Sequence, residues 1–200
     1  MKRFAGCAMF LTALLVLLPA SPLRAANVDH YVIGNVNAKT PGKVQPGLLL
    51  MGGGDRNFDA MHWFMNKAGN GHIVILRASL GGQIGEEFFN KVGGIQSAET
   101  FVFKDRDAAS DPKILAAIRR ADGIFIAGGD QARYVRYWRG TPLAKALNDH
   151  VKAGKPLAGT SAGLAIQCEY LYGAMDGGSI TSPRALADPL GDSNTIETGF

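Results

Sequence analysis

The chain has few cysteines, few charged residues and no apolar run long enough to cross a membrane. Its 200 residues include 2 cysteines, Cys7 and Cys168, and 19% of them are charged against 46% hydrophobic. This balance excludes disordered and collagen-like chains and fits one globular domain of ordinary size. The longest apolar run, residues 4–18, is about 15 residues long, whereas a transmembrane helix needs ~20. The 4 histidines and Cys168 lack the spacing of metal ligands, so we expect no metal and no cofactor.

Residues 1–25 have the three parts of a secretory signal peptide. Lys2 and Arg3 give a basic start, residues 4–18 are apolar, and small residues and prolines follow up to Ala25. We expect cleavage after Ala25, which would leave residues 26–200 as a single domain that is secreted or periplasmic and not held in a membrane. An uncleaved N-terminal anchor is the alternative.

The excess of positive charge lies mostly in this N-terminal segment. The formal net charge is +4 and the isoelectric point is near 9.1. Residues 1–25 hold Lys2, Arg3 and Arg24 and no acid, so without them 18 of the 21 basic residues remain against 17 acids, a net charge of +1. A near-neutral domain without a basic cluster has no footprint for a phosphate backbone, so we expect no nucleic-acid partner. Cys168 would be the one cysteine left, which excludes an internal disulfide.

After Pro46, short apolar runs alternate with amphipathic segments. This alternation predicts an α/β doubly wound fold, a mostly parallel sheet with helices on both faces. A short apolar stretch at residues 31–33 is expected to form an edge strand or a lead-in to the sheet, and beyond Tyr172 we expect surface loops with one short strand around Ile180. The expected strands are residues 48–51, 73–76, 100–103, 124–127 and 156–159, and the expected helices are near 57–68, 84–92, 111–120 and 131–153, the last with a break at 140–142.

The pentapeptide Gly159-Thr160-Ser161-Ala162-Gly163 fits the Gly-x-Ser-x-Gly pattern of a nucleophilic serine. It follows an expected buried strand and precedes an expected helix over residues 162–172, which is the context that such a turn requires. A serine at this tight turn has a strained backbone, so the positions two residues away must be glycine. The pattern predicts Ser161 as the catalytic nucleophile and the free N–H of Ala162 as an oxyanion donor. The alternative is a small-residue turn at which a helix packs closely on a strand.

A second glycine-rich loop, Gly128-Gly129-Asp130-Gln131, follows the expected strand at 124–127. Consecutive strands of such a sheet are neighbours about two-thirds of the time, and this would bring the loop beside Ser161. The N–H of Gly129 is then a second candidate oxyanion donor, and Gln131 and Arg133 are candidates for binding a substrate. Asp130 is expected to cap the next helix rather than to act in catalysis.

Together these segments resemble the serine peptidase family of cyanophycinase and the aspartyl dipeptidases. The residues that carry the resemblance are 124–131, 133, 141–143 and 154–163, and the Gly-Gly-Asp-Gln form is closer to the cyanophycinase branch. The family is similar in fold to class I glutamine amidotransferases but has serine as its nucleophile. The resemblance implies Ser161 as nucleophile, the N–H groups of Gly129 and Ala162 as the oxyanion hole, and Gln131 in the substrate pocket. It also implies a peptide substrate, with aspartyl-linked peptides such as cyanophycin as the leading class.

The chain departs from this family in its histidines. A serine nucleophile needs a base, normally a histidine oriented by a carboxylate, and in this family the histidine follows the serine. No histidine follows Ser161. His150 is expected at the opposite end of the strand that leads to Ser161, ~15 Å away. His72 starts a strand, His30 and His62 have no evident route to the site, and all four are expected to be structural or surface residues.

Two explanations compete for this departure. The 200 residues are either a fragment of a longer product, which we favour, or a shortened and inactive relative. The expected function is an exported serine peptidase that acts through an acyl-enzyme on Ser161, and a homodimer is left open. The alternatives are a non-catalytic binding module on the same fold and a secreted α/β-hydrolase esterase. Nucleotide binding is disfavoured, because the loop at 52–55 lacks the third glycine of a dinucleotide fingerprint.

Overall fold

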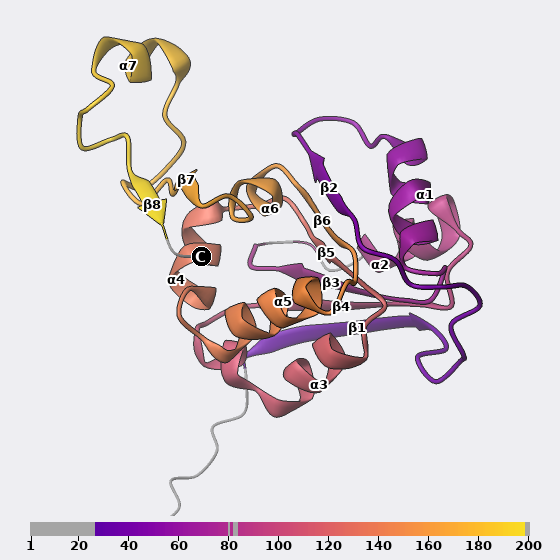
Figure 1. Cartoon of the computed structure of the whole chain (residues 1–200). Helices are drawn as coiled ribbons and strands as arrows, with labels where there is room; N and C mark the ends of the chain where they lie inside the picture. Colours follow the sequence, from indigo (N-terminus) through magenta and orange to yellow (C-terminus); the bar gives the residue numbers. More distant parts are fainter. Residues whose placement is uncertain (1–26, 80, 82–83, 199–200) are drawn as a thin grey trace, which may run out of the picture.

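A central sheet organises the molecule. The computed structural model describes residues 27–79, 81 and 84–198, so the expected signal peptide at residues 1–25 lies outside the described residues. The strands of the sheet are β1 (Val28–Gly34), β2 (Leu48–Met51), β3 (His72–Arg77), β4 (Ser97–Phe103), β5 (Gly123–Ile126) and β6 (Leu157–Thr160). Their order is β1-β4-β3-β5-β6-β2 (Figure 1). All pairs are parallel except β1 with β4, so residues 31–33 belong to an edge strand as expected.

Helices cover both faces of this sheet. One face carries α1 (Phe58–Lys67), α2 (Ile84–Glu86) and the π-helix η1 (Glu87–Val92), and the other carries α3 (Pro112–Arg120), α4 (Gln131–Trp138) and α5 (Pro142–Lys152). A short 3-10 helix, η2 (Asp107–Ser110), precedes α3. The mostly parallel sheet between two helical layers confirms the predicted α/β doubly wound architecture.

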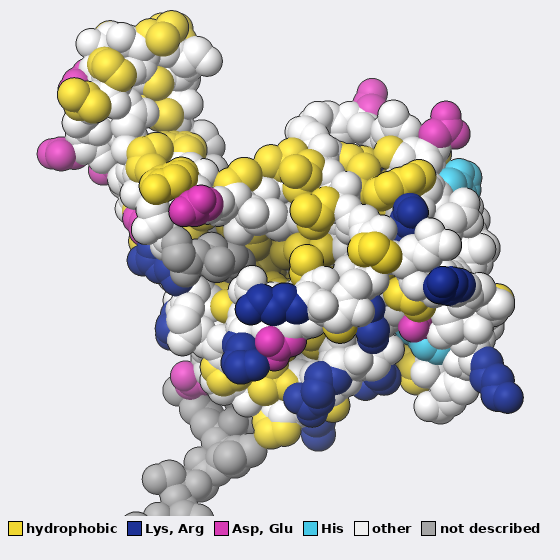
Figure 2. Space-filling view, viewed as in Figure 1, with side chains coloured by type: hydrophobic (Ala, Val, Ile, Leu, Met, Phe, Trp, Pro, Cys, Tyr) yellow, Lys and Arg dark blue, Asp and Glu magenta, His cyan; other side chains and the backbone are white. Residues whose placement is uncertain are grey.

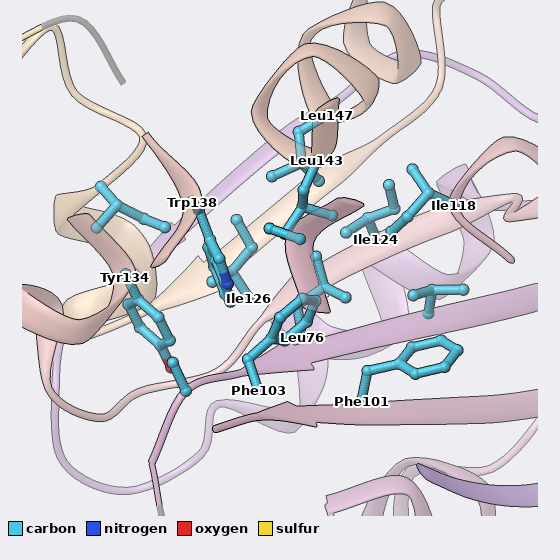
Figure 3. Packing of buried hydrophobic residues seen from close by; sticks show 14 of the residues in the cluster. Leu76, Phe101, Phe103, Ile118, Ile124, Ile126, Tyr134, Trp138, Leu143 and Leu147 are labelled. Carbon is cyan, nitrogen blue, oxygen red and sulfur yellow. The ribbon is translucent and has the colours of Figure 1, made fainter. Parts of the chain in front are cut away.

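Alternating strand residues feed two separate cores. Val74 and Leu76 of β3 point to the α3–α5 side, whereas Ile73 and Ile75 point to the α1 side. Figure 3 shows the first of these cores, in which Trp138 lies among strand and helix side chains. Because both faces of β3, β4, β5 and β6 are buried, these strands have no alternation of apolar and polar residues.

The strand order reverses at β3. From β3 the chain goes through α2 and η1 to β4 on one side, then returns through α3 to β5 on the other side. In open α/β sheets, ligands bind outside the carboxyl ends of the strands near such a reversal. A ligand-binding site is therefore expected at the loops after β3, β5 and β6.

Capping side chains fix where the helices begin. Asn57 accepts a hydrogen bond from the N–H of Ala60 at the start of α1, and Asp111 accepts from Lys113 at the start of α3. The predicted break at 140–142 is confirmed, because α4 ends at Trp138 and α5 begins at Pro142 with Thr141 as its cap.

Two predictions for the C-terminal part are wrong. The helix after Ser161, α6, spans only Ala162–Ala165, and residues Tyr170–Tyr172 form a strand, β7, instead of its end. β7 pairs antiparallel with β8 (Ile196–Thr198), and no strand forms around Ile180 within the described residues, where a loop leads into α7 (Ser182–Ala187). Aromatic residues favour a strand once a partner is present, and that partner lies too far along the chain for local periodicity to reveal it.

The β2 edge of the sheet is apolar at its surface. Leu48 and Leu50 of β2 are 56% and 51% exposed. A cavity of about 180 Å³ beside them is lined by Leu147 and Val151 of α5 and Leu157 of β6, and Figure 2 shows the apolar side chains around this hollow. Among the described residues, no helix has the length and hydropathy that spanning a membrane would require.

Candidate active site

Ser161 occupies the turn between β6 and α6. Its φ is 53° and its ψ is −120°, a conformation that costs a residue other than glycine about 1–3 kcal/mol. The N–H of Ser161 donates to the carbonyl of Met51 at 3.0 Å, so the end of β2 holds the turn. The strained turn predicted by the Gly-x-Ser-x-Gly pattern is present, and Ser161 is exposed beyond the carboxyl end of β6.

The two flanking glycines are required by close backbone contacts. A Cβ on Gly163 would lie 2.1 Å from the carbonyl oxygen of Ile126 in β5. A Cβ on Gly159 would lie 2.3 Å from the carbonyl oxygen of Gly163. Both distances are shorter than any real contact of a methyl group, so β5, β6 and α6 can approach one another only with glycine at these positions.

Three strand ends meet at Ser161. A Cβ on Gly128, after β5, would lie 3.3 Å from Ser161 Cβ, and a Cβ on Gly53, after β2, would lie 3.9 Å from Ser161 Oγ. The hydroxyl of Thr160 donates to the carbonyl of Gly52 at 2.8 Å. The loop after β5 therefore lies beside Ser161 as predicted. The loop after β2 was not predicted there, because nothing local in the sequence places the first parallel strand next to the last.

Gly129 packs against a residue that sequence reasoning missed. A Cβ on Gly129 would lie 1.9 Å from the hydroxyl of Ser79, which follows β3. The same hydroxyl accepts the N–H of Asp130 at 3.1 Å. Asp130 caps α4 by accepting from the N–H of Ala132 at 2.9 Å, as expected. The assignment of the Gly129 and Ala162 N–H groups as oxyanion donors stays a prediction, although Ala162 begins α6 and its N–H has no partner within that helix.

A cavity of about 310 Å³ opens beside the loop after β5. Its lining residues are Gly129, Asp130, Gln131, Ala132, Arg136, Ala174, Gly177, Gly178 and Ser179. Gln131 is therefore next to a space that a side chain of a substrate can enter. Arg133 instead lies half-exposed in an ion pair with Asp130 at 3.5 Å, a type of contact that adds little stability. Arg136, which was not predicted, lines the cavity and donates to the carbonyl of Met175 at 3.3 Å.

Tyr134 lies under the same loop as a neutral donor. Burial raises the pKa of its phenol to about 12, because the charged form cannot be solvated. Its hydroxyl donates to the carbonyl of Ala127 at 2.7 Å. At neutral pH, Tyr134 is therefore a fixed hydrogen-bond donor and not a base.

His150 and His62 are bonded to backbone carbonyls and not to Ser161. Nε2 of His150 lies 3.1 Å from the carbonyl of Pro156, just before β6 begins, whereas Ser161 lies just after β6 ends. Four strand residues separate these points, which is ~15 Å. Burial lowers the pKa of His150 to about 4, so the ring is neutral at pH 7. His62, in α1, contacts the carbonyl of Val92 at 2.8 Å.

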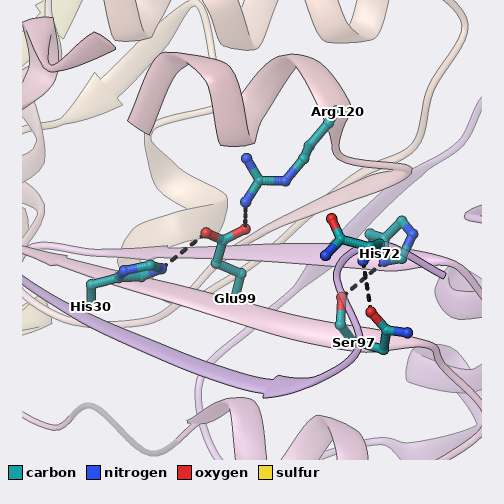
Figure 4. Close-up of polar contacts among 7 residues, drawn as sticks. His30, His72, Ser97, Glu99 and Arg120 are labelled. Carbon is teal, nitrogen blue, oxygen red and sulfur yellow. Dashed lines mark hydrogen bonds and ion pairs between the residues drawn. The ribbon is translucent and has the colours of Figure 1, made fainter. Parts of the chain in front are cut away.

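His30 and His72 are also engaged elsewhere (Figure 4). His30 lies 2.9 Å from a carboxylate oxygen of Glu99, whose other oxygen accepts from Arg120. His72 contacts the hydroxyl of Ser97 at 2.9 Å. His30 is in the edge strand β1, and β4, β3 and β5 separate it from β6.

No histidine therefore serves as a base for Ser161. All four histidines of the chain lie among the described residues, and each is bonded to a structural partner other than Ser161, as the sequence predicted. Within the same described ranges, no group of three or more histidine, cysteine or acidic side chains is arranged to hold a metal ion. The carboxyl side of the sheet thus offers an exposed strained serine, glycine-rich loops and a polar cavity.

Comparison with known proteins identifies a family match. A family model described as "Peptidase family S51" matches residues 85–188, which include β4 to β7, the loop after β5 and Ser161. The chain is also similar to two proteins named cyanophycinase. It is 26% identical over 167 residues to the one from Trichormus variabilis, covering 77% of this chain and 55% of the relative. It is 36% identical over 109 residues to the one from Synechococcus elongatus, covering 54% of this chain and 33% of the relative.

The aligned part of the chain thus spans about half of the Trichormus relative's length and a third of the Synechococcus one. Among solved structures, one similar to this chain is "Crystal structure of a peptidase from an acI-B1 Actinobacterium". Its TM-score is 0.47 at 18% sequence identity, over 66% of this chain and 60% of that one.

Proposed function

Because the chain belongs to peptidase family S51, we propose that it is a serine peptidase with Ser161 as its nucleophile. The observation that carries this proposal is the exposed Ser161 at φ 53°, in a turn that only glycines at 159 and 163 permit. Backbone strain of this kind persists where the surrounding structure enforces it, and it is concentrated at functional sites.

The proposed reaction has two steps. Ser161 Oγ attacks the carbonyl carbon of a peptide bond and loses its proton to a base. The C–N bond then breaks, the amine leaves with a proton, and water hydrolyses the acyl ester on Ser161. The N–H groups of Ala162 and Gly129 would hold the negative charge that develops on the carbonyl oxygen. Gln131 would contact the substrate from the cavity beside Gly129.

The base of this reaction is not one of the four histidines. His150 lies at the other end of β6, and burial keeps its pKa near 4. His30 is bonded to Glu99 and His72 to Ser97, both in β4, and His62 is bonded to the carbonyl of Val92. We therefore assign Ser161 the role of nucleophile and leave the group that accepts its proton unassigned.

For the substrate, we propose peptides with aspartyl linkages of the cyanophycin type. The support is the similarity to proteins named cyanophycinase, together with the Gly-Gly-Asp-Gln loop and the polar cavity that Gln131 lines. We also propose that the protein is exported, on the strength of the signal-peptide features of residues 1–25.

The test is hydrolysis of purified cyanophycin and of an activated ester by the protein and by Ser161→Ala. We expect new amino groups from cyanophycin with the wild type and none with the variant. Ester cleavage without cyanophycin cleavage would instead support the esterase. Equal release of amino groups by both proteins would contradict the proposal.

A binding module is the second candidate, and it is favoured because every histidine is bonded to a partner other than Ser161. Such a module would retain cyanophycin without turnover. Sedimentation of the insoluble polymer together with the protein, unaffected by Ser161→Ala and with no release of amino groups, would identify this function.

A further inference from the structure

Two hydroxyl groups from different elements hold the loop that follows β5. The first belongs to Tyr134 in α4, which donates to the carbonyl of Ala127 at 2.7 Å and lies 3.3 Å from the carbonyl of Gly128. The Tyr134 ring is fully buried and stacks on Trp138 with centroids 4.4 Å apart. Its hydroxyl is therefore fixed in place under the loop.

The second hydroxyl belongs to Ser79, which follows β3. Its oxygen accepts the N–H of Asp130 at 3.1 Å and fills the space where a Cβ of Gly129 would be. The loop is thus anchored at its beginning by Tyr134 and at its end by Ser79.

This anchoring determines how the Gly128–Gly129 peptide is oriented. In a planar trans peptide, the C=O and the N–H point in opposite directions. The carbonyl of Gly128 is directed toward Tyr134, so the N–H of Gly129 in the same peptide unit is directed away from it. The N–H of Asp130 is used by Ser79. A Cβ built on Gly128 would lie 3.3 Å from Ser161 Cβ, so Gly128 lies beside the serine. The Gly129 N–H, which is directed away from Tyr134 and is not used by Ser79, is therefore a donor that the loop can offer next to Ser161.

We infer that Ser79 and Tyr134 are positioning residues for the oxyanion hole. They fix the Gly128–Gly129 peptide so that its N–H is presented to the carbonyl oxygen of a substrate attacked by Ser161. This inference rests on the proposed peptidase function. Neither residue touches the substrate; both act through the backbone of the loop.

The first measurement does not depend on activity. Amide hydrogen exchange by NMR is compared between the full-length wild type, Ser79→Ala and Tyr134→Phe. We expect the Asp130 amide to exchange about tenfold faster in Ser79→Ala, the effect of losing one hydrogen bond. Ser79→Thr, which keeps the hydroxyl, should restore slow exchange. Tyr137→Phe, on the same helix, is the matched control and should leave the loop unchanged.

The second measurement is the rate at which a fluorophosphonate probe modifies Ser161 in the same variants. We expect Tyr134→Phe and Ser79→Ala to react about 10- to 100-fold more slowly, because small displacements of a catalytic group have effects of this size. Ser79→Thr and Tyr137→Phe should react at the wild-type rate. If the two residues only stabilised the fold, the variants would change the midpoint of unfolding, but the rate of modification of Ser161 would stay at the wild-type value.

The outcomes separate the two claims. If the wild type reacts and the Tyr134 and Ser79 variants react equally fast, the positioning role is wrong and the peptidase proposal stands. If the wild type does not react at Ser161, the peptidase proposal fails. In that case, amide hydrogen exchange still tests whether the two hydroxyls hold the Gly128–Gly129 peptide. Unchanged exchange rates in both Ser79→Ala and Tyr134→Phe would show that they do not.

Discussion

The two ends of the parallel strands, here called the amino side and the carboxyl side of the sheet, differ in the local environment of the residues at each end. On the amino side, where the parallel strands begin, buried polar groups such as His150 and Asp122 contact nearby carbonyl, amide and hydroxyl groups. On the carboxyl side, where they end, Ser161 is strained and exposed among glycines that touch neighbouring backbone. The amino side therefore stabilises the fold, whereas the strained turn on the carboxyl side presents a serine at some cost in stability.

The largest effect is expected from Gly163→Ala on the carboxyl side. The new methyl group would lie 2.1 Å from the carbonyl oxygen of Ile126, which is backbone and cannot turn aside. We expect the free energy of unfolding to fall by about 4 kcal/mol, at the upper end of overpacking effects. Urea unfolding measures it. Gly52→Ala is the control, since a Cβ there meets no atom within 4 Å, and similar losses in both variants would refute the close-contact explanation.

The next largest effect is expected on the amino side, where the free energy of unfolding should depend on pH through His150. Burial lowers the pKa of His150 from 6.5 to about 4 in the folded protein. As the pH falls below 6.5, the unfolded chain binds a proton that the folded protein binds only near pH 4, so stability is complete above 6.5 and declines between these values. The expected decline is about 3 kcal/mol.

Urea unfolding at pH 7.5 and pH 4.5 measures this decline. His150→Gln cannot titrate and keeps a donor for the carbonyl of Pro156, so its decline should be smaller than that of the wild type. An identical pH dependence in the two proteins would show that His150 is not responsible.

A smaller effect is expected from Asp122→Ala, also on the amino side. One carboxylate oxygen of Asp122 accepts the hydroxyl of Thr40 at 2.6 Å and the N–H of His72 at 2.8 Å, and the residue is 8% exposed. Its loss leaves both donors without a partner and should lower the free energy of unfolding by about 2 kcal/mol. Asp122→Asn keeps an acceptor and should lose less; thermal unfolding that ranks the two variants in the opposite order would contradict this role.

The smallest effect is a gain in stability on the carboxyl side. Ser161→Gly replaces a strained residue by one that adopts a positive φ freely, so we expect the free energy of unfolding to rise by about 1 kcal/mol. Ala174→Gly, at φ 50°, should give a similar gain away from the serine. Calorimetry that finds Ser161→Gly less stable than the wild type would show that the turn is not strained.

Local patterns were sufficient to predict much of this molecule. Short apolar runs that alternate with amphipathic segments predicted the parallel strands. The spacing of Gly159, Ser161 and Gly163 predicted the strained turn. Thr141 before Pro142 predicted where α5 begins. In each case the physical cause lies within a few residues of the feature, so the sequence contains it directly.

The remaining features depend on contacts between distant segments. β2 lies beside β6, which brings Gly53 to Ser161 across more than a hundred residues. Ser79 is a single serine after a strand, and only the β3–β5 pairing places it under Gly129. The pairing of β7 with β8 likewise overrode the helix expected after Ser161. Tertiary pairing of this kind has no local pattern in the sequence.

The strained Ser161 is expected to be a reactive nucleophile. Mass spectrometry of the protein after treatment with a fluorophosphonate probe, followed by peptide mapping, tests it directly. We expect one adduct, located on Ser161 and absent from Ser161→Ala. An adduct on another residue, or equal modification of the wild type and Ser161→Ala, would contradict it.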